Sequence, residues 1–142
     1  MFAKQLTVFI ENRSGRLSEV LGVLRENDVN ILSMSLADTT EFGLLRLIVN
    51  NAAHGKEMLS RKGFSSLLSD VSIIEIPHKV GSLQTLLAAI DANGVNIEYM
   101  YGLSIEADHA YVVLKSSDAE KLEKILEAQK VRTLSCQDLS KI

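Results

Sequence analysis

The chain has 142 residues, of which 46% are hydrophobic and 23% charged, with 15 Lys and Arg against 18 Asp and Glu and a formal net charge of −3. The apolar fraction excludes a disordered chain, and the acidic balance excludes the electrostatic pattern of a nucleic-acid binder. One cysteine, Cys136, excludes an internal disulfide. The N-terminus lacks a signal peptide, and the longest charge-free stretch, residues 80–90, is too short to span a bilayer. We therefore expect a cytoplasmic protein with neither membrane nor nucleic-acid partners.

The first half of the chain alternates between strand and helix patterns. Leu6, Val8 and Ile10 recur with the period of a strand, and a loop follows at residues 12–15. A helix comes next, with a buried stripe of Leu17, Val20, Leu21 and Leu24 and an end at Asn27-Asp28. After it we predict strands over 29–37 and 42–49 joined by a turn at 38–41, a helix over 54–62 ended by Gly63, and a strand over 64–68.

The second half repeats the first at a shift of 66 residues. Eight of the 22 positions from Ile10 to Ile31 are identical to those from Ile76 to Ile97. We predict a strand over 71–76, then a helix with the stripe Leu83, Leu86, Leu87 and Ile90. Strands over 95–105 and 110–115 follow, and then a helix with the stripe Leu122, Ile125 and Leu126 that begins with a Ser117–Glu120 capping box. The last predicted element is a strand over 131–136, with Cys136 in the core.

This element order predicts an α+β protein of two domains, residues 1–70 and 71–142. Each reads as a ferredoxin-like βαββαβ unit, an antiparallel sheet with both helices on one face. Only Ser69-Asp70 lies between the last strand of one unit and the first strand of the next, so the units are expected to pack against each other. The third strands are apolar on both faces, which indicates either a second copy covering the open face or tolerated surface apolarity.

No recognised catalytic or metal-binding motif is present. Nucleophile-elbow, zinc-protease, Walker and dinucleotide-binding patterns are all missing from the sequence. The three histidines, His54, His78 and His109, lie on separate elements without metal-ligand spacing. We therefore predict no catalytic residue, no metal ligand and no cofactor.

The loop after the first strand of each repeat is the best candidate for a binding site. A glycine permits a tight turn and a close ligand approach, and the following helix offers free N–H groups to a carboxylate. A basic residue, Arg13 or Lys79, adds positive charge. The alternative is that the glycines only start helices. The candidate residues are Asn12, Arg13, Ser14, Gly15, Arg16 and Leu17 in the first loop and His78, Lys79, Val80, Gly81, Ser82 and Leu83 in the second.

The two loops, each followed by a helix and a Val-Asn-Ile strand start, resemble the ACT domain, a small regulatory module on enzymes of amino-acid metabolism. The resemblance covers nearly the whole chain. The pair of repeats also resembles small stand-alone proteins made only of two such domains. It implies binding of an amino acid at an interface between ACT units, where the loop of one unit meets the second strand of a neighbour. The strand residues implied by this match are Asn30, Ile31, Asn96 and Ile97.

Two departures from the family pattern rank the first loop above the second. Ser14 and Val80 stand where the family has proline before the glycine, and His78 replaces the acidic or amide residue that Asn12 retains. Asn30 and Asn96 have an alternative role in capping backbone groups at a strand start.

The leading hypothesis is therefore a non-catalytic, homodimeric amino-acid sensor whose partner is an enzyme of amino-acid metabolism. One alternative is an assembly module with degenerate ligand sites. Another is an acylphosphatase-like enzyme on the same fold, for which Asn12-Arg13 is a faint match.

Overall fold

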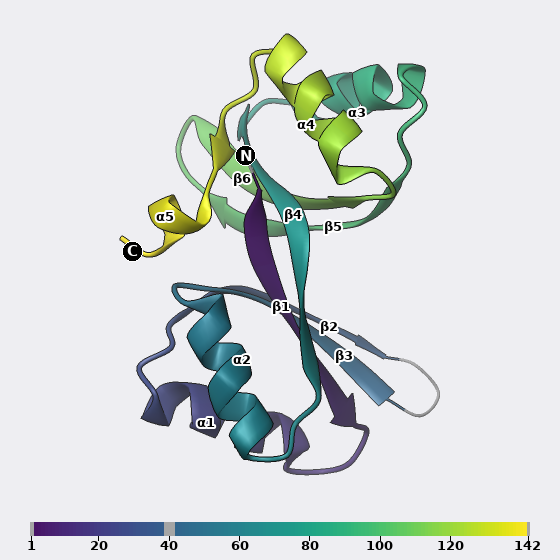
Figure 1. Cartoon of the computed structure of the whole chain (residues 1–142). Coiled ribbons are helices and arrows are strands. Elements are labelled where there is room, and N and C mark those ends of the chain that lie inside the picture. The colour runs from purple at the N-terminus through teal and green to yellow at the C-terminus, as the bar shows by residue number, and fades with distance from the viewer. Residues whose placement is uncertain (1, 39–41, 142) are drawn as a thin grey trace. The chain divides into compact units, whose positions relative to one another are not determined.

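The computed structural model describes residues 2–38 and 42–141, and Figure 1 shows its elements. The first half contains β1 (Ala3–Glu11), α1 (Arg16–Glu26), β2 (Ile31–Asp38), β3 (Phe42–Val49), α2 (Ala52–Arg61) and β4 (Ser66–Pro77). The second half continues with α3 (Ser82–Ala92), β5 (Ile97–Ile105), β6 (His109–Ser116), α4 (Ala119–Ala128), β7 (Thr133–Leu134) and α5 (Cys136–Leu139). The predicted βαββαβ order is confirmed, while residues 39–41 of the predicted 38–41 turn lie outside the described residues.

β4 is one continuous strand, which corrects the predicted break at Ser69-Asp70. Ser66–Pro77 is extended over 12 residues, because a Ser-Asp pair without glycine or proline does not force a turn. The chain divides into two compact units, one comprising residues 4–69 with 138–142 and the other residues 1–3 with 70–137. These are called the first and second unit below.

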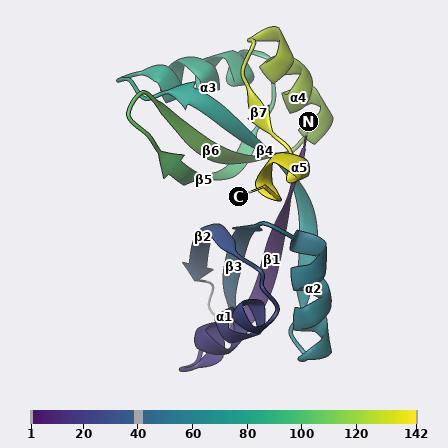
Figure 2. The ribbon, with the colours of Figure 1, turned by 90° about the vertical axis from the view of Figure 1, so that its left-hand side faces the viewer.

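The first unit is a sheet with its two long helices on one face. The strand order is β4-β1-β3-β2, with Leu6 opposite Leu47 and Ile10 opposite Gly43 in the β1–β3 pair. α1 and α2 cover one face of this sheet (Figure 2). The fully enclosed residues of the core come from both layers and are Leu6, Val8, Val20, Leu24, Leu45, Leu47 and Leu59. Val20 and Leu24 of the predicted α1 stripe are buried and Leu17 packs partly buried against this core, whereas Val23 takes the core position that was predicted for Leu21.

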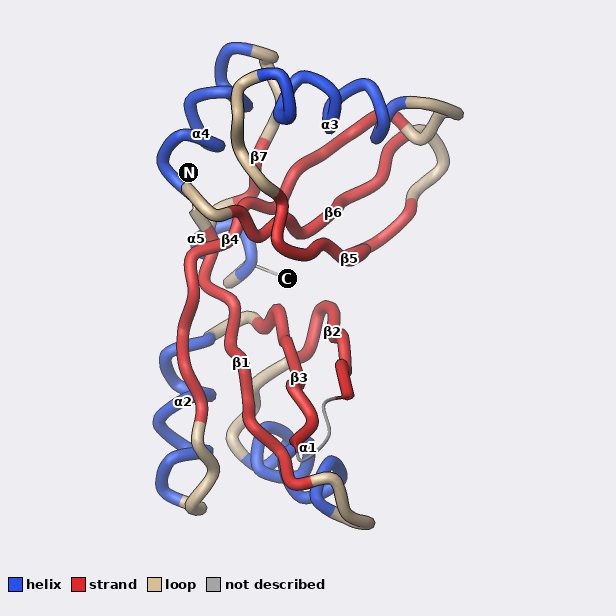
Figure 3. Tube along the Cα trace, turned by 90° about the vertical axis from the view of Figure 1, so that its right-hand side faces the viewer, coloured by secondary structure: helices blue, strands red, loops and turns tan. Residues whose placement is uncertain are grey.

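The second unit repeats this arrangement in the order β7-β4-β6-β5. α3 and α4 lie over the same face of β5 and β6 (Figure 3). Its core joins Ile74 and Leu114 of the sheet to Leu86, Ile90, Leu122 and Leu126 of the helices. Both units therefore have the ferredoxin-like fold that the sequence predicts.

The sheet residues that face away from the helices are also enclosed in part. Ile48 and Val113 alternate with the helix-facing residues of β3 and β6, and both have 0% exposure.

The second repeat is one residue longer than the first, and the extra residue lies in β5. α1 and α3 begin at Arg16 and Ser82, a shift of 66, whereas α2 and α4 begin at Ala52 and Ala119, a shift of 67. β5 has nine residues against eight in β2, and its pairing with β6 changes register between Gly102 and Ser104. Such an irregularity absorbs one added residue without disturbing the rest of the sheet.

The C-terminal segment differs from the prediction. The strand ends at Leu134, and Cys136 begins the short helix α5, where its side chain is exposed. Leu139, at 2% exposure, is the residue of α5 that is buried. Cys136 is therefore not a core residue. Within residues 2–38 and 42–141, no helix combines the length and apolar character that crossing a membrane requires.

The predicted capping box at Ser117 is also wrong, because Asp118 is the N-cap of α4. Its carboxylate accepts a hydrogen bond from the Lys121 backbone N–H at 3.1 Å. The Ser117 backbone N–H instead donates to the Asn96 carbonyl at 3.0 Å.

Replacing Asp118 with alanine should destabilise the chain by about 1 kcal/mol, since the first turn of α4 loses its side-chain acceptor and an acidic group at the helix N-terminus. Urea unfolding followed by circular dichroism measures this loss. Ser117→Ala is the matched control and should change the free energy of unfolding by only a few tenths of a kcal/mol. A larger loss for Ser117→Ala than for Asp118→Ala would contradict the assignment.

Candidate functional site: two glycine loops

Each glycine loop ends in a left-handed residue that caps the next helix. Gly15 has φ 88° and ψ −16°, and Gly81 has φ 87° and ψ −8°. This conformation is strained for residues with a Cβ, which explains glycine at both places. Neither α1 nor α3 receives a side-chain cap, whereas Asn51 and Asp118 cap α2 and α4. The first N–H groups of α1 and α3 are therefore left without a side-chain acceptor at the positive end of the helix dipole.

The first loop opens onto a cavity of 320 Å³ within the first unit. Asn12, Arg13 and Leu17, three of the six predicted loop residues, line it. Ser14, Gly15 and Arg16 are not among its lining residues. The remaining walls come from the ends of the three neighbouring strands, through Ile10, Glu11, Leu36, Ala37, Asp38 and Gly43.

The charged groups of this cavity differ in whether they already have partners. Arg13 donates from Nε to Glu11 Oε2 at 2.8 Å, and this contact lowers the pKa of the Glu11 carboxyl. The side chains of Asn12 and Asp38 have neither a hydrogen-bond nor an ion-pair partner among residues 2–38 and 42–141. One amide and one carboxylate are thus left to interact with a bound molecule.

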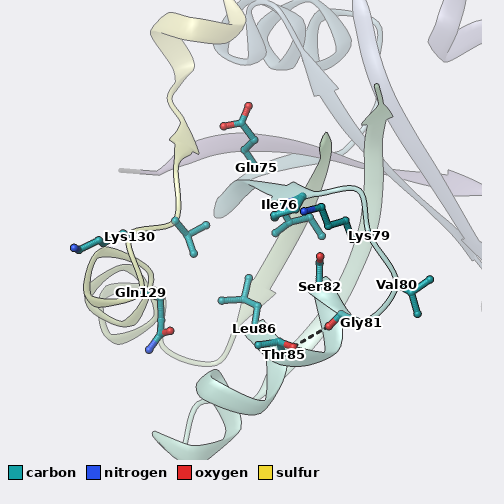
Figure 4. Close-up of a pocket in the computed structure, with 12 residues that line it drawn as sticks. Glu75, Ile76, Lys79, Val80, Gly81, Ser82, Thr85, Leu86, Gln129 and Lys130 are labelled. Atoms are coloured by element: carbon teal, nitrogen blue, oxygen red, sulfur yellow. Dashed lines mark hydrogen bonds between the residues drawn. The ribbon is translucent and has the colours of Figure 1, made fainter. Parts of the chain in front are cut away.

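The second loop opens onto a larger cavity, of 540 Å³, on a different side of the loop. Its lining includes Lys79, Val80, Gly81 and Ser82 but not His78 or Leu83. Figure 4 shows the apolar side chains of Ile76 and Leu86 behind Ser82, with Lys79 near the same opening. The other lining residues are Glu75, Pro77, Thr85, Gln129, Lys130 and Val131. Thr85 donates its hydroxyl to the Gly81 carbonyl at 3.0 Å, so its proton is already used.

An arginine–phenylalanine pair occupies the equivalent space in the first unit. The Arg16 guanidinium lies 4.4 Å from the centre of the Phe64 ring and also pairs with Glu19 at 2.7 Å. At the corresponding positions the second unit has Ser82 and Val131, which are much smaller. The two repeats therefore keep similar loops but leave different spaces around them.

The predicted strand residues do not meet the loop of their own unit. Ile31 pairs with Val49, whereas Asp38, at the other end of β2, pairs with Gly43 beside Ile10. The Val-Asn-Ile starts thus lie at the opposite end of each sheet. Asn30 donates its backbone N–H to Asn50 Oδ1 at 2.9 Å, and the Asn96 carbonyl accepts from Ser117. Ile31 and Ile97 pack partly buried against the cores.

Sequence reasoning missed the strand ends that line the first cavity, above all Asp38 and Gly43. The predicted topology contained the signal, because β1 and β2 of a βαβ unit are parallel and end at the same edge of the sheet. In the structure Leu36 is 54% exposed although it faces the helix side, which agrees with an open place there.

A cluster of charged side chains surrounds His109 in the second unit. Its Nδ1 is 2.7 Å from Asp108 Oδ1, and its Nε2 is 3.1 Å from Glu106 and 3.6 Å from Glu75. Asp108, followed by the other two carboxylates, raises the pKa of His109, and His109 in turn lowers the pKa of Asp108. Glu75 also accepts a hydrogen bond from the Tyr111 hydroxyl at 3.0 Å and lies 3.6 Å from Arg132. Burial, followed by Glu75, raises the pKa of Tyr111.

The raised pKa of His109 predicts a pH-dependent contribution to stability. Folding favours the protonated imidazole, so the contribution is complete below the unfolded pKa of about 6.5 and disappears as the pH rises through the higher folded value. The thermal midpoint of wild type should therefore exceed that of His109→Gln by more at pH 6 than at pH 8. A difference between wild type and His109→Gln that is constant with pH would contradict the prediction.

Within the described part of the chain, no three His, Cys, Asp or Glu side chains come together in a way that could hold a metal ion. The two loops and the cavities beside them contain backbone N–H groups, amides, carboxylates and lysines, next to apolar walls. This chemistry suits a small polar molecule with an apolar part.

Comparison with known proteins identifies the family. A model described as an ACT domain pair matches residues 1–142. Protein BT0572 from Bacteroides thetaiotaomicron is 37% identical, with a TM-score of 0.94 over 100% of this chain and 98% of that one. The aspartate kinase regulatory subunits of Thermus thermophilus (ligand-free form) and Thermus flavus are 20% and 16% identical, with TM-scores of 0.63 and 0.60. The alignments cover 89% and 90% of this chain and 90% and 93% of theirs, and they show a shared fold. No curated protein gives a significant match. The match along all 142 residues shows that the chain belongs to the ACT domain family, as a tandem pair of ACT domains.

Proposed function

We propose that this chain is a non-catalytic regulatory protein that binds an amino acid at its glycine loops. The observation that carries the proposal is the pair of helices capped by Gly15 and Gly81, each without a side-chain cap and each beside a cavity. Free N–H groups at a helix N-terminus bind a carboxylate well, and every amino acid has one. Cavities of 320 and 540 Å³ are at the small end of the range of about 300–1,000 Å³ for ligand sites, as a ligand of this size requires.

The regulatory part of the proposal rests on the family, since ACT domains are regulatory modules. The Thermus proteins that share the fold are regulatory subunits of aspartate kinase. By analogy, we propose that ligand binding here changes the affinity of the chain for an enzyme of amino-acid metabolism. Such coupling requires that the ligand prefer one of two states of the chain.

A homodimer is part of the same proposal. Asn30 and Asn96 lie away from the loops of their own units, so a site that joins a loop to a Val-Asn-Ile start needs a second unit, which another copy of the chain would supply. β2 is a terminal strand of its sheet and exposes Met34 at 43% and Leu36 at 54%. Light scattering during size-exclusion chromatography should give twice the chain mass of 15.6 kDa. A single-chain mass at micromolar concentration would contradict the dimer.

The test of ligand binding is a thermal-shift screen of the twenty amino acids, followed by calorimetry of those that raise the midpoint. A ligand at 100 times its Kd should stabilise the fold by about 2.7 kcal/mol. A folded protein that responds to no amino acid would refute the proposal and favour an assembly module. Acetyl phosphate in the same panel, assayed for turnover, tests the acylphosphatase alternative.

A further inference from the structure

The first cavity is built around a row of three residues that crosses the sheet. Asp38 of β2 pairs with Gly43 of β3, and Gly43 pairs with Ile10 of β1. All three residues belong to the helix-facing side, because their neighbours two positions away, Leu36, Leu45 and Val8, follow the same alternation. Gly43 has no side chain of its own, and a Cβ built there would lie 3.4 Å from Leu36 Cδ1, so the Leu36 side chain packs beside the glycine. The cavity of 320 Å³ is lined by this row and by Leu36.

The corresponding row of the second unit is uncharged and has no glycine. Ile105 pairs with Ala110, and Ala110 pairs with Ile76. Ile105 thus stands where the first unit has Asp38, and Ala110 stands where it has Gly43. Neither Ile105 nor Ala110 lines the 540 Å³ cavity of the second unit. The Asp38–Gly43–Ile10 row is therefore a property of the first repeat and does not follow from the fold alone.

The groups around this row match the parts of a free amino acid. The Asp38 carboxylate, which has no hydrogen-bond or ion-pair partner among residues 2–38 and 42–141, can accept hydrogen bonds from an ammonium group. The Asn12 amide and the uncapped N-terminus of α1 can donate to a carboxylate. Ile10, Leu17 and Leu36 supply an apolar wall for the side chain. Because Arg13 pairs with Glu11 at 2.8 Å, the charge left over in this lining is that of Asp38, which disfavours a ligand with a negative side chain.

We propose that the first unit binds a zwitterionic amino acid with an aliphatic side chain over Gly43, and that Asp38 recognises its ammonium group. The inference rests on the proposed amino-acid binding and adds the ligand class and its location in one repeat. Asp38, Gly43 and Leu36 become specificity-determining residues of the first unit.

The test compares two ligands that differ at the amino group. Calorimetry on the full chain with L-leucine and with its 2-oxo acid should give leucine the lower Kd, by roughly 10- to 100-fold, the loss expected for one hydrogen bond to a charged group. L-aspartate should also bind more weakly than leucine. Equal affinity for leucine and the 2-oxo acid would overturn the inference.

Three variants then locate the site. Asp38→Asn should raise the Kd for leucine roughly 10- to 100-fold and leave that of the 2-oxo acid within about twofold. Gly43→Val places a branched side chain against Leu36 at the cavity wall and should abolish leucine binding without a change of charge. Asp91→Asn is the control, since Asp91 is an exposed carboxylate of α3 outside both cavities, and it should leave both Kd values unchanged. Circular dichroism and thermal midpoints confirm that each variant is folded.

The outcomes separate this inference from the proposed function. If leucine or another amino acid binds and Asp38→Asn leaves its Kd within twofold, the assignment to Asp38 is wrong while amino-acid binding stands. The same holds if Gly43→Val retains binding in the folded state. If none of the twenty amino acids binds, both the proposed function and this inference are refuted.

Discussion

Replacing Gly55 with leucine is expected to destabilise the chain by about 1–3 kcal/mol, in the range for overpacking a well-filled core. Gly55 lies in α2, where the helix rests directly on the core of the first unit. A Cβ built at this position would lie 3.2 Å from Leu6 Cδ2, 3.4 Å from Leu24 Cδ2 and 3.5 Å from Val29 Cγ1. The leucine side chain has no open space, so α2 must move away from the sheet. Urea unfolding of the variant measures the loss.

Gly22→Ala is the matched control, because Gly22 is also inside a helix but has open space around its Cα. No heavy atom lies within 4 Å of a Cβ at Gly22. This substitution should stabilise the chain by about 0.5–1 kcal/mol through the helix propensity of alanine. Two results would show that the α2–sheet contact is not as close as described. One is a Gly55→Leu variant with the same free energy of unfolding as wild type, and the other is a Gly22→Ala variant that loses as much stability as Gly55→Leu.

Much of the fold was predictable because its signals are periodic and occur twice. The stripes of α1 and α4 follow the spacing of a helix, and helix ends at Asn27 and Asn93 agree with the structure. The one extra residue of the second repeat was not predicted from the sequence. The identities at a shift of 66 extend only as far as Ile97, before the place where the extra residue lies. After Ile97, the bulge between Gly102 and Ser104 takes up the extra residue, and the strand pairs beyond it match those of the first unit at a shift of 67 residues.

The predictions failed where several local choices are nearly equal in energy. Ser117 and Asp118 are both good helix N-caps, and tertiary pairing of the Ser117 backbone with Asn96 decides between them. Ser69-Asp70 is polar enough for a turn, yet the strand continues because its neighbours pair on both sides of it. Cys136 follows a strand of only two residues, whose length no periodic pattern can predict.

The candidate site was predictable in part. The glycine loops were found from the repeat, because a left-handed residue before a helix requires glycine. The spaces beside the loops depend on residues distant in sequence, such as Phe64 stacked on Arg16 in the first unit and Val131, which lines the same cavity as Ser82, in the second. Only the register of the sheet brings Asp38 and Gly43 to the first loop. A single sequence does not show such contacts without the pairing of its strands.

Gly15→Val should abolish the response to an amino acid, because the loop depends on a backbone conformation that valine does not tolerate. No heavy atom lies within 4 Å of a Cβ at Gly15, so conformation rather than crowding is the cause. A left-handed residue with a Cβ costs roughly 1–2 kcal/mol, and β-branching adds to this. The loop is expected to relax to negative φ, which displaces Asn12 and Leu17, the residues on either side of it that line the cavity. Calorimetry with L-leucine measures the loss of affinity, and the Kd of Gly15→Val is expected to be more than ten times that of wild type.

Two variants separate the conformational effect from a general loss of structure. Gly15→Asn introduces a side chain that tolerates the left-handed region, so it should keep most of the affinity although it is larger than alanine. Gly81→Val imposes the same strain on the second unit, where φ is 87°, and should lower stability to a similar degree without changing the Kd at the first loop. If Gly15→Val and Gly15→Asn weaken binding equally, the left-handed geometry is not what holds the ligand. If Gly81→Val removes the response and Gly15→Val does not, the ligand binds at the second loop, and the N–H groups of α3 are the ones that hold its carboxylate.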